Sequence, residues 1–263
     1  MDRAFSGIDF ELANAARIYD YLLGGGHNFA VDREQAARIL DGNPDMERVC
    51  RANRAYLGRV VAWCVDQGIE QFLDLGSGVP TVGNVHEIAH RTAPQARVAY
   101  VDFEPVAVAH AHEIVRDLET VTITRADLRD PDSVLTAPGV AELLDWSRPV
   151  ALLSVAVLHF IADPRLSEIL ARYRAALAPG SVQALSHGSA DLDDAEVAER
   201  IRRAAEGYRG SATEAHLRSR AEIHGLLGDL ELVGPGLVDI VHWPRPEANQ
   251  ALTGAYAAVA RMP

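Results

Sequence analysis

The residues best suited to chemistry form a short string at 74–78, Asp-Leu-Gly-Ser-Gly. Glycines at such a turn let a ligand approach the main chain, and a helix that begins there offers unbonded N–H groups. A dinucleotide fingerprint would need a further glycine at position 81, which is Thr81 here. An acid directly before the loop, Asp74, repels a pyrophosphate but suits a cofactor with an ammonium group. The string therefore favours a positively charged cofactor over a dinucleotide.

Two further acids follow the next two apolar segments. Asp102 lies in the string Tyr-Val-Asp-Phe-Glu at 100–104, and Asp127 lies in Arg-Ala-Asp-Leu at 125–128. Asp102, or Glu104 in its place, can accept hydrogen bonds from ribose hydroxyls, and Asp127 can accept one from an adenine amine. Ligands of open parallel sheets bind at the carboxyl ends of the strands, where these acids would meet. Together with the glycine loop, the acids predict S-adenosylmethionine as the cofactor.

The first part of the chain, up to Gly68, has the apolar spacing of helices. One helix is expected over 11–23, ended by the glycines at 24–26, and another over 43–68, where an Asn-Pro pair supplies an N-cap and a first-turn proline. The three glycines are either a stop signal only or a hinge for the helix before them; a hinge would explain three in a row, since helix termination needs only one. We expect residues 1–68 to form a helical cap or lid over the site.

After Gly68, short apolar runs alternate with helical stretches, which predicts a doubly wound parallel sheet covered on both faces. The last two extended segments have no helix between them, so they should pair antiparallel. The fold class is therefore α/β, a Rossmann-like seven-stranded sheet, mostly parallel with an antiparallel last strand, over residues 69–263. The expected strands are 71–75, 97–102, 121–125, 150–155, 182–186, 230–240 and 251–260.

The charge and hydropathy of the chain limit the kinds of binding partner that we expect. The 263 residues carry a formal net charge of -12 and include no lysine, so a nucleic-acid backbone would meet a repelling surface. The longest apolar run, at 150–158, is about half of what a bilayer span needs, and the chain does not begin with a signal-peptide pattern. Cys50 and Cys64 lie on one expected helix, too far apart to bridge, so we expect buried thiols. These features predict a cytoplasmic protein with neither a nucleic-acid nor a membrane partner.

Two stretches carry a family resemblance. The second half, with its glycine loop, its acids and the string Leu-Ser-Val-Ala-Val-Leu-His-Phe at 153–160, resembles class I S-adenosylmethionine-dependent methyltransferases. The string Ala-Arg-Ile-Tyr-Asp-Tyr-Leu-Leu-Gly-Gly-Gly-His-Asn-Phe at 16–29, with 72–87, resembles a bacterial methyltransferase family first described as a domain of unknown function. The resemblance implies the cofactor, the fold and 69–263 as the cofactor-binding domain, whereas the family has no agreed substrate.

The resemblance also assigns cofactor-binding positions along the strand ends. It implies contacts to the methionine end, the ribose, the adenine and the methyl sulfonium. The implied residues are Asp74, Gly76, Ser77 and Gly78 for the methionine end, Asp102 and Phe103 for the ribose, Asp127 and Leu128 for the adenine, and Ser154, Val155 and Ala156 for the sulfonium. The fourth strand ends without an Asn-Pro-Pro-Tyr string, which argues against amino-group methylation of adenine or glutamine.

A hydroxyl acceptor would need a base beside it. Tyr19 and His27 come from the expected lid, and His159 follows the fourth strand, so these three are the catalytic candidates. His187, at the end of the fifth strand, is an alternative for the wall that faces the substrate. The alternative for each is a structural role in the core or in a loop.

Four arginines are possible carboxylate ligands. Arg54 and Arg59, on the helix before the first strand, could reach the methionine carboxylate of the cofactor. Arg218 and Arg220 could bind an acidic substrate. The alternative for each arginine is a solvated surface position.

A literal His-Glu-x-x-His occurs at 86–90, the zinc-protease signature. The expected helix follows the glycine loop directly, so its apolar side should pack on the sheet while both imidazoles point outward. Because no residue stands out as a third ligand, we predict no metal site.

The function predicted from the sequence is S-adenosylmethionine-dependent methyl transfer to an unidentified small molecule. A catalytically silent protein that binds the same cofactor as a sensor or interaction module is the alternative. A nucleotide-cofactor oxidoreductase and a metal hydrolase rank behind both. The sequence leaves the acceptor and the oligomeric state open.

Overall fold

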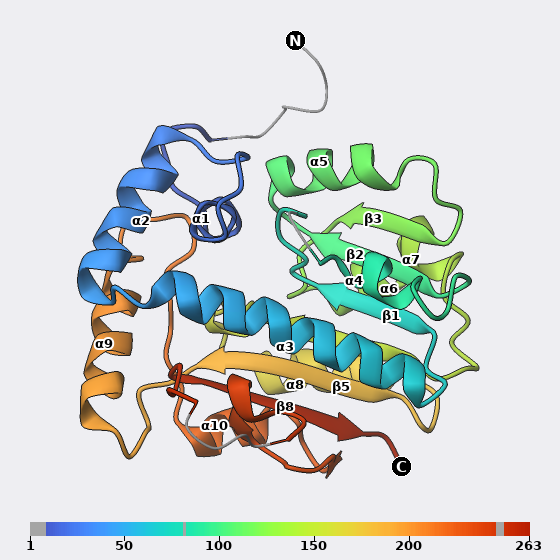
Figure 1. Cartoon of the computed structure of the whole chain (residues 1–263). Coiled ribbons are helices and arrows are strands. Elements are labelled where there is room, and N and C mark those ends of the chain that lie inside the picture. Colours follow the sequence, from blue (N-terminus) through green and yellow to red (C-terminus); the bar gives the residue numbers. More distant parts are fainter. Residues whose placement is uncertain (1–8, 81–82, 246–249) are drawn as a thin grey trace.

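The computed structural model describes residues 9–80, 83–245 and 250–263, and it contains one open sheet in the order β3-β2-β1-β4-β5-β8-β6, with β7 paired to β8 (Figure 1). Strands β1 to β5 are parallel to their neighbours, as expected. The structure confirms three of the predicted ranges, starts β4 one residue later and extends β5 by two. These strands are β1 (Gln71–Leu75), β2 (Arg97–Asp102), β3 (Val121–Arg125), β4 (Ala151–Val155) and β5 (Val182–Gly188).

The C-terminal strands differ in detail from the expectation. β8 (Ala255–Arg261) lies antiparallel between β5 and β6, which confirms the antiparallel last strand. The single strand expected at 230–240 is instead two short strands, β6 (Glu231–Leu232) and β7 (Val238–Asp239). Between them Pro235 has no N–H to donate and Gly236 has φ 89°, so the chain leaves the ladder. The described residues therefore form eight strands rather than seven.

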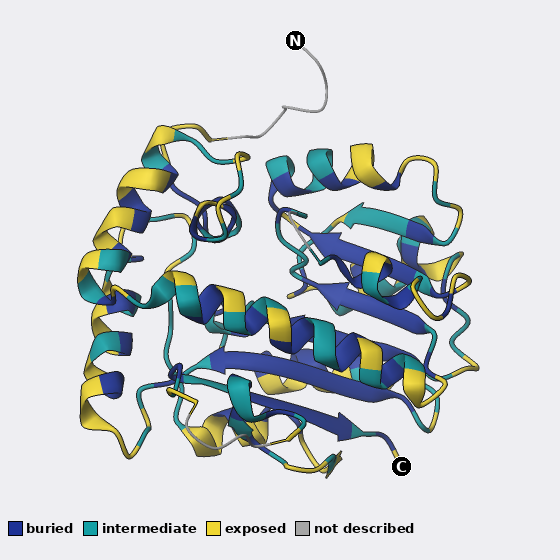
Figure 2. Ribbon diagram, viewed as in Figure 1, coloured by how far each residue is buried: buried dark blue, intermediate teal, exposed yellow. Residues whose placement is uncertain are grey.

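Helices cover both faces of the sheet, and the strands are buried between them (Figure 2). One face packs on three helices and the other on four. Alternate side chains of β1 pack into the two helical layers, with Phe72 on one face of the sheet and Leu73 and Leu75 on the other. The first layer holds α3 (Met46–Asp66), α4 (Val85–Ala89) and α5 (Pro105–Val115), and the second holds α6 (Pro131–Thr136), α7 (Pro138–Ala141), α8 (Leu166–Arg174) and α10 (Arg220–Gly225).

Helix α3 starts later than expected. Asn43 does not cap it but ends α2 (Ala30–Gly42), and its side chain accepts a hydrogen bond from the backbone of Asp45. The C-terminal stop at Gly68 is as predicted, with φ 78°. Cys50 and Cys64 are buried and free on this helix, again as predicted. None of the described helices combines the length and apolar character needed to cross a membrane.

A third apolar cluster joins α1 (Ala15–Leu22), α2 and α9 (Ala195–Glu206) beside the carboxyl ends of the parallel strands (Figure 1). Helix α1 begins after its cap Asn14, later than the expected residue 11. Helices α2 and α9 approach closely because both carry glycines at the contact. A Cβ on Gly42 would lie 2.7 Å from the backbone of Arg203, and one on Gly207 would lie 2.8 Å from Cα of Ile39. That residues 1–68 act as a lid stays a prediction.

Candidate functional site

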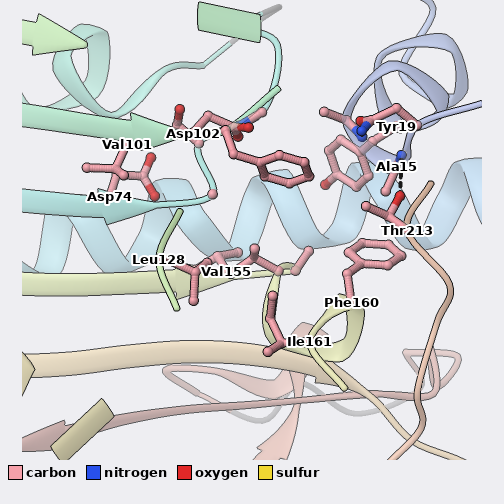
Figure 3. A pocket seen from close by; sticks show the side chains of 18 of the residues that line it. Ala15, Tyr19, Asp74, Val101, Asp102, Leu128, Val155, Phe160, Ile161 and Thr213 are labelled. Atoms are coloured by element: carbon pink, nitrogen blue, oxygen red, sulfur yellow. Dashed lines mark hydrogen bonds between the residues drawn. The ribbon is translucent and has the colours of Figure 1, made fainter. Parts of the chain in front are cut away.

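A cavity of about 1190 Å³, including its open mouth, lies at the carboxyl ends of β1, β2 and β4 below α1; we call it cavity A. Figure 3 shows Asp74, Asp102 and Leu128 at its sheet side and Tyr19 and Phe160 toward the N-terminal helices. Ten of the eleven expected cofactor residues line cavity A, namely Asp74, Gly76, Ser77, Gly78, Asp102, Phe103, Asp127, Leu128, Val155 and Ala156.

The glycine loop after β1 leaves no room for a side chain at Gly76. Gly76 has φ 71°, and a Cβ there would lie 2.2 Å from Cγ2 of Val157. The backbone N–H of Gly78 donates to Oδ2 of Asp102 at 2.7 Å, which joins the loop to the end of β2. The Ser77 hydroxyl is buried without a hydrogen-bond partner among the described residues. An unsatisfied buried hydroxyl beside an open cavity is available to a ligand.

Asp74 and Asp102 make this end of cavity A strongly receptive to positive charge. Burial raises the pKa of Asp74 to about 7, with Arg54 opposing the shift and Asp102 adding to it. Burial likewise raises the pKa of Asp102 to about 6, against backbone hydrogen bonds from Glu104 and Gly78. Two neighbouring buried carboxylates repel one another, so a cation placed between them is stabilised. The donor set therefore fits S-adenosylmethionine, which carries an ammonium and a sulfonium.

Asp102, and not its alternative Glu104, reaches cavity A. The Glu104 carboxylate caps α5 by accepting from the backbone of Ala107 and pairs with Arg17 at 2.9 Å. Arg17 also pairs with Asp32 at 2.8 Å, so the three side chains form a buried ion triad between α1, α2 and the end of β2. Arg17 lies in the string that carries the family resemblance, but no local pattern in the sequence marks it as a partner of Glu104.

Ser154 is the one expected cofactor residue outside the lining. Its side chain is buried, and its hydroxyl donates to the carbonyl of Ala184 on the neighbouring β5 at 3.3 Å. The next residues, Val155 and Ala156, do line cavity A. Ala156 has φ 55°, an uncommon conformation for a residue with a side chain. Such strained positions cluster at functional sites.

Asp127 lies at the mouth of cavity A, half buried, and is already paired. The guanidinium of Arg129 donates to both of its oxygens, with Nε 3.0 Å from Oδ1 and 2.9 Å from Oδ2. Both residues line the cavity. An adenine amine would therefore meet a carboxylate whose orientation Arg129 determines.

A second cavity of about 680 Å³, cavity B, adjoins cavity A and shares four lining residues with it. One of the four is Tyr19, whose hydroxyl donates to the carbonyl of Cys50 at 3.0 Å and accepts from Nδ2 of Asn53 at 2.9 Å. Burial raises the pKa of Tyr19 far above its ordinary value. These contacts suit Tyr19 to a wall between the cavities better than to a general base.

The two other candidate bases lie in different surroundings. His27 lines neither cavity; its ring stacks on His110 of α5 with the centroids 3.5 Å apart. His159 lines cavity B, and burial, helped by His187 and Arg218, lowers its pKa well below the ordinary value. His159 is therefore neutral at physiological pH and has a lone pair to accept a proton. Of the three, only His159 combines a cavity position with this property.

His187 also lines cavity B, but both of its ring nitrogens are engaged. Nδ1 lies 2.8 Å from the carbonyl of Gly188, and Nε2 lies 2.9 Å from Nη1 of Arg218, which identifies Nδ1 as the donor. Arg218 also donates to the carbonyls of Leu158 and Ile161, so it fixes the loop that carries His159. These hydrogen bonds give Arg218 a structural role in place of the role in binding an acidic substrate that the sequence suggested.

Of the three other candidate arginines, Arg54, Arg59 and Arg220, only Arg54 lines cavity A. Arg59 donates to the carbonyls of Ile240 and Trp243. Arg220 donates to the carbonyl of Leu237 and lies over the ring of Tyr256. Arg54 is therefore the arginine left to face a cofactor carboxylate.

The His-Glu-x-x-His string does not present two outward imidazoles, so that expectation was wrong. His86 is 6% exposed, and its Nδ1 lies 2.8 Å from the hydroxyl of Tyr100. Nε2 of His90 lies 2.9 Å from the carbonyl of Ala96. Within the described part of the chain no group of three metal-ligating side chains comes together. His86 turns inward because both its backbone N–H and its Nδ1 lie within hydrogen-bond distance of the Tyr100 hydroxyl on β2.

Residues from a distant part of the chain complete cavity A. The hydroxyl of Thr213 accepts from the backbone of Ala15 at 2.8 Å, and the backbone of Ala212 donates to the carbonyl of Ala13 at 2.8 Å. Both Ala212 and Thr213 line cavity A. No local pattern in the sequence points to this segment, because the contact joins residues about 200 positions apart.

The sheet order and the cavity at its carboxyl edge define a Rossmann-like methyltransferase fold. A DUF574 family protein from Streptomyces avermitilis is 36% identical, with a TM-score of 0.89, covering 97% of this chain and 99% of its own. A candidate methyltransferase from Thermobifida fusca is 34% identical, with a TM-score of 0.90, covering 98% and 97%. Magnesium protoporphyrin IX methyltransferase from Synechocystis, with bound S-adenosylhomocysteine, shares the fold at 16% identity, a TM-score of 0.54 and coverage of 94% and 93%.

The family model described as S-adenosyl methyltransferase matches residues 1–263. The chain therefore belongs to this family, as the resemblance predicted, and S-adenosylmethionine is its cofactor. No protein with a curated description matches the chain.

Proposed function

We propose that this protein transfers the methyl group of S-adenosylmethionine, bound in cavity A, to a small molecule. One observation carries the proposal: the glycine loop and the acids Asp74, Asp102 and Asp127 line a single cavity that adjoins a second one. A cofactor alone needs one cavity, whereas a transfer needs a second site beside it. Holding the two reactants in line can contribute several kcal/mol to catalysis.

His159 is the residue that we propose as proton acceptor. S-adenosylmethionine held by the glycine loop and the acids of cavity A would supply the methyl group to the acceptor oxygen and would keep the electron pair of the broken carbon–sulfur bond on sulfur. The hydroxyl proton then passes to the neutral imidazole of His159 and from there to solvent. Burial lowers the pKa of His159, so the imidazole is unprotonated over the physiological range, and it is a weaker base than an exposed histidine.

Binding and transfer are tested separately. Isothermal titration with S-adenosylhomocysteine should give a Kd in the micromolar range or below, while NAD should not bind; the reverse would favour an oxidoreductase. Incubation with cofactor labelled in the methyl group and a cell extract should move label into a small-molecule fraction. Tight binding without any transfer would favour the silent sensor or interaction protein instead.

The proposal includes a cytoplasmic location and a small-molecule partner rather than a nucleic acid. Two buried free thiols, Cys50 and Cys64, support a reducing compartment. The formal net charge of -12 opposes binding to a phosphate backbone. Locating the tagged protein by cell fractionation tests the first part, and a salt-dependent DNA-binding assay tests the second.

A further inference from the structure

Cavity B is built mainly from apolar side chains of elements far apart in the sequence. Met46 and Val49 come from α3, and Ile201 and Ala205 come from α9. Helix α9 is held against α2 by the close glycine contacts described above, so this wall is a fixed part of the fold. Cavity B is therefore lined mainly by apolar side chains, and those of α9 determine much of its shape.

The chamber carries no charged side chain among the described residues that line it. Two of its polar groups satisfy each other, since the hydroxyl of Ser186 donates to Oδ1 of Asn53 at 2.6 Å. Nδ2 of Asn53 in turn donates to the hydroxyl of Tyr19. A charged ligand would lose its hydration there without an opposite charge, so the chamber selects against it.

One polar group remains open to a ligand. Nδ1 of His159 is buried and has no hydrogen-bond partner among the described residues. A buried nitrogen without a hydrogen-bond partner is unfavourable, and a donor from a ligand can offset that cost. Beside it, the rings of Phe160 and Tyr208 lie 5.2 Å apart between centroids and offer an aromatic wall. Aromatic ligands gain from such edge and tilted contacts.

We propose that cavity B binds the methyl acceptor and that this acceptor is an uncharged aromatic compound with a hydroxyl group, which donates a hydrogen bond to His159. The inference rests on the proposed function for its link to methyl transfer. The evidence that cavity B binds such a compound is its apolar and aromatic lining, its lack of charged side chains and the unpartnered Nδ1 of His159. Four residues, among them Ala156 and Phe160, line both cavity A and cavity B, so the two cavities are adjacent.

The test uses three matched probes on the full chain, with and without S-adenosylhomocysteine: 2-naphthol, 2-naphthoate and naphthalene. We expect 2-naphthol to bind at least about tenfold more tightly than 2-naphthoate, because the chamber lacks a cation. The hydroxyl should improve binding over naphthalene by about threefold to tenfold, and His159→Phe should remove that advantage. Equal or tighter binding of 2-naphthoate, or no detectable binding of 2-naphthol, overturns the proposal.

A cavity-filling variant locates the probe. Ala205→Phe should weaken 2-naphthol by at least about tenfold, whereas Ala195→Phe, on the exposed start of the same helix, should not. If Ala205→Phe fails to fold, Ala215→Phe fills the same chamber. Unchanged 2-naphthol binding in the folded filling variant overturns the site. If S-adenosylhomocysteine does not bind to the unsubstituted chain, the proposed function itself is contradicted. This result differs from unchanged 2-naphthol binding in the filling variant, which contradicts only the acceptor site.

Discussion

Nη1 of Arg17 lies 2.9 Å from Oε1 of Glu104, and both side chains are 2% exposed. Glu104 follows Asp102 by two residues and donates its backbone N–H to that carboxylate at 2.9 Å. Helix α1 is thereby tied, through one buried ion pair, to the end of the strand that carries Asp102. A buried pair of this kind adds little net stability over well-packed apolar side chains, whereas the removal of one partner alone leaves an uncompensated buried charge.

Breaking this pair from one side should be costly. Arg17→Met leaves the Glu104 and Asp32 carboxylates buried without their cation, so we expect a loss of about 3–5 kcal/mol in the free energy of unfolding. Urea denaturation measures it. The matched control is Arg51→Met, which removes an exposed pair with Glu47 and should cost about 0–1 kcal/mol. Similar losses in the two variants would contradict a structural role for the triad.

The carboxylate of Asp102 should matter more to ligand affinity than to folding. We expect Asp102→Asn to weaken S-adenosylhomocysteine by about tenfold to a hundredfold, the value of hydrogen bonds to a charged group. Isothermal titration near pH 8 measures the change, because the parent carboxylate, with its pKa of about 6, is ionised there. Asp117→Asn, on the exposed end of the segment after α5, is the control and should bind as the parent does. Unchanged affinity in Asp102→Asn would remove the ribose assignment.

Asp74 should make stability depend on pH. Burial raises its pKa from 3.8 to about 7, so between about pH 4 and pH 7 the folded chain holds a proton that the unfolded chain releases. The free energy of unfolding therefore falls as the pH rises through this window. Asp74→Asn removes the ionisation and should be more stable than the parent at about pH 8 by up to a few kcal/mol. The two chains should converge below about pH 4 in urea titrations.

The same variant separates stability from binding. Asp74→Asn loses the negative charge that faces the cofactor, so S-adenosylhomocysteine should bind more weakly than to the parent, with the larger difference above pH 7. If Asp74→Asn is more stable than the parent but binds S-adenosylhomocysteine more weakly, Asp74 contributes to ligand binding at a cost in stability. A loss of stability at about pH 8 would show instead that the ionised carboxylate has a structural partner.

Two glycines of one loop offer a matched pair. Gly76 and Gly78 both have positive φ, at 71° and 66°, but only a Cβ on Gly76 meets a neighbour, the side chain of Val157 at 2.2 Å. We expect Gly78→Ala to cost about 1–2 kcal/mol from backbone strain alone. Gly76→Ala adds the clash and should cost at least about 1 kcal/mol more. Chemical denaturation of both variants checks this order, and equal losses would contradict the close packing.

The parts of the site that could be predicted share one property: each lies where a regular element ends. Asp74 and Asp102 end or directly follow the apolar runs of buried strands, and Asp127 follows the half-buried edge strand β3, so each lies beside a run that is visible in the sequence. The prediction failed where a pattern is short or broken. Pro235 and Gly236 interrupt the sixth strand, and His86 turns inward on a helix of only five residues.

The amino-acid sequence by itself determined the positions of the parallel strands along the chain, the glycine loop and the acids at the strand ends, because periodicity and turn residues act over a few neighbouring positions. Only the tertiary structure decided that Arg17 joins Glu104, that Thr213 closes cavity A, and that α9 forms the wall of cavity B. These contacts join residues far apart along the chain. Their energy depends on burial, which no local window of sequence records.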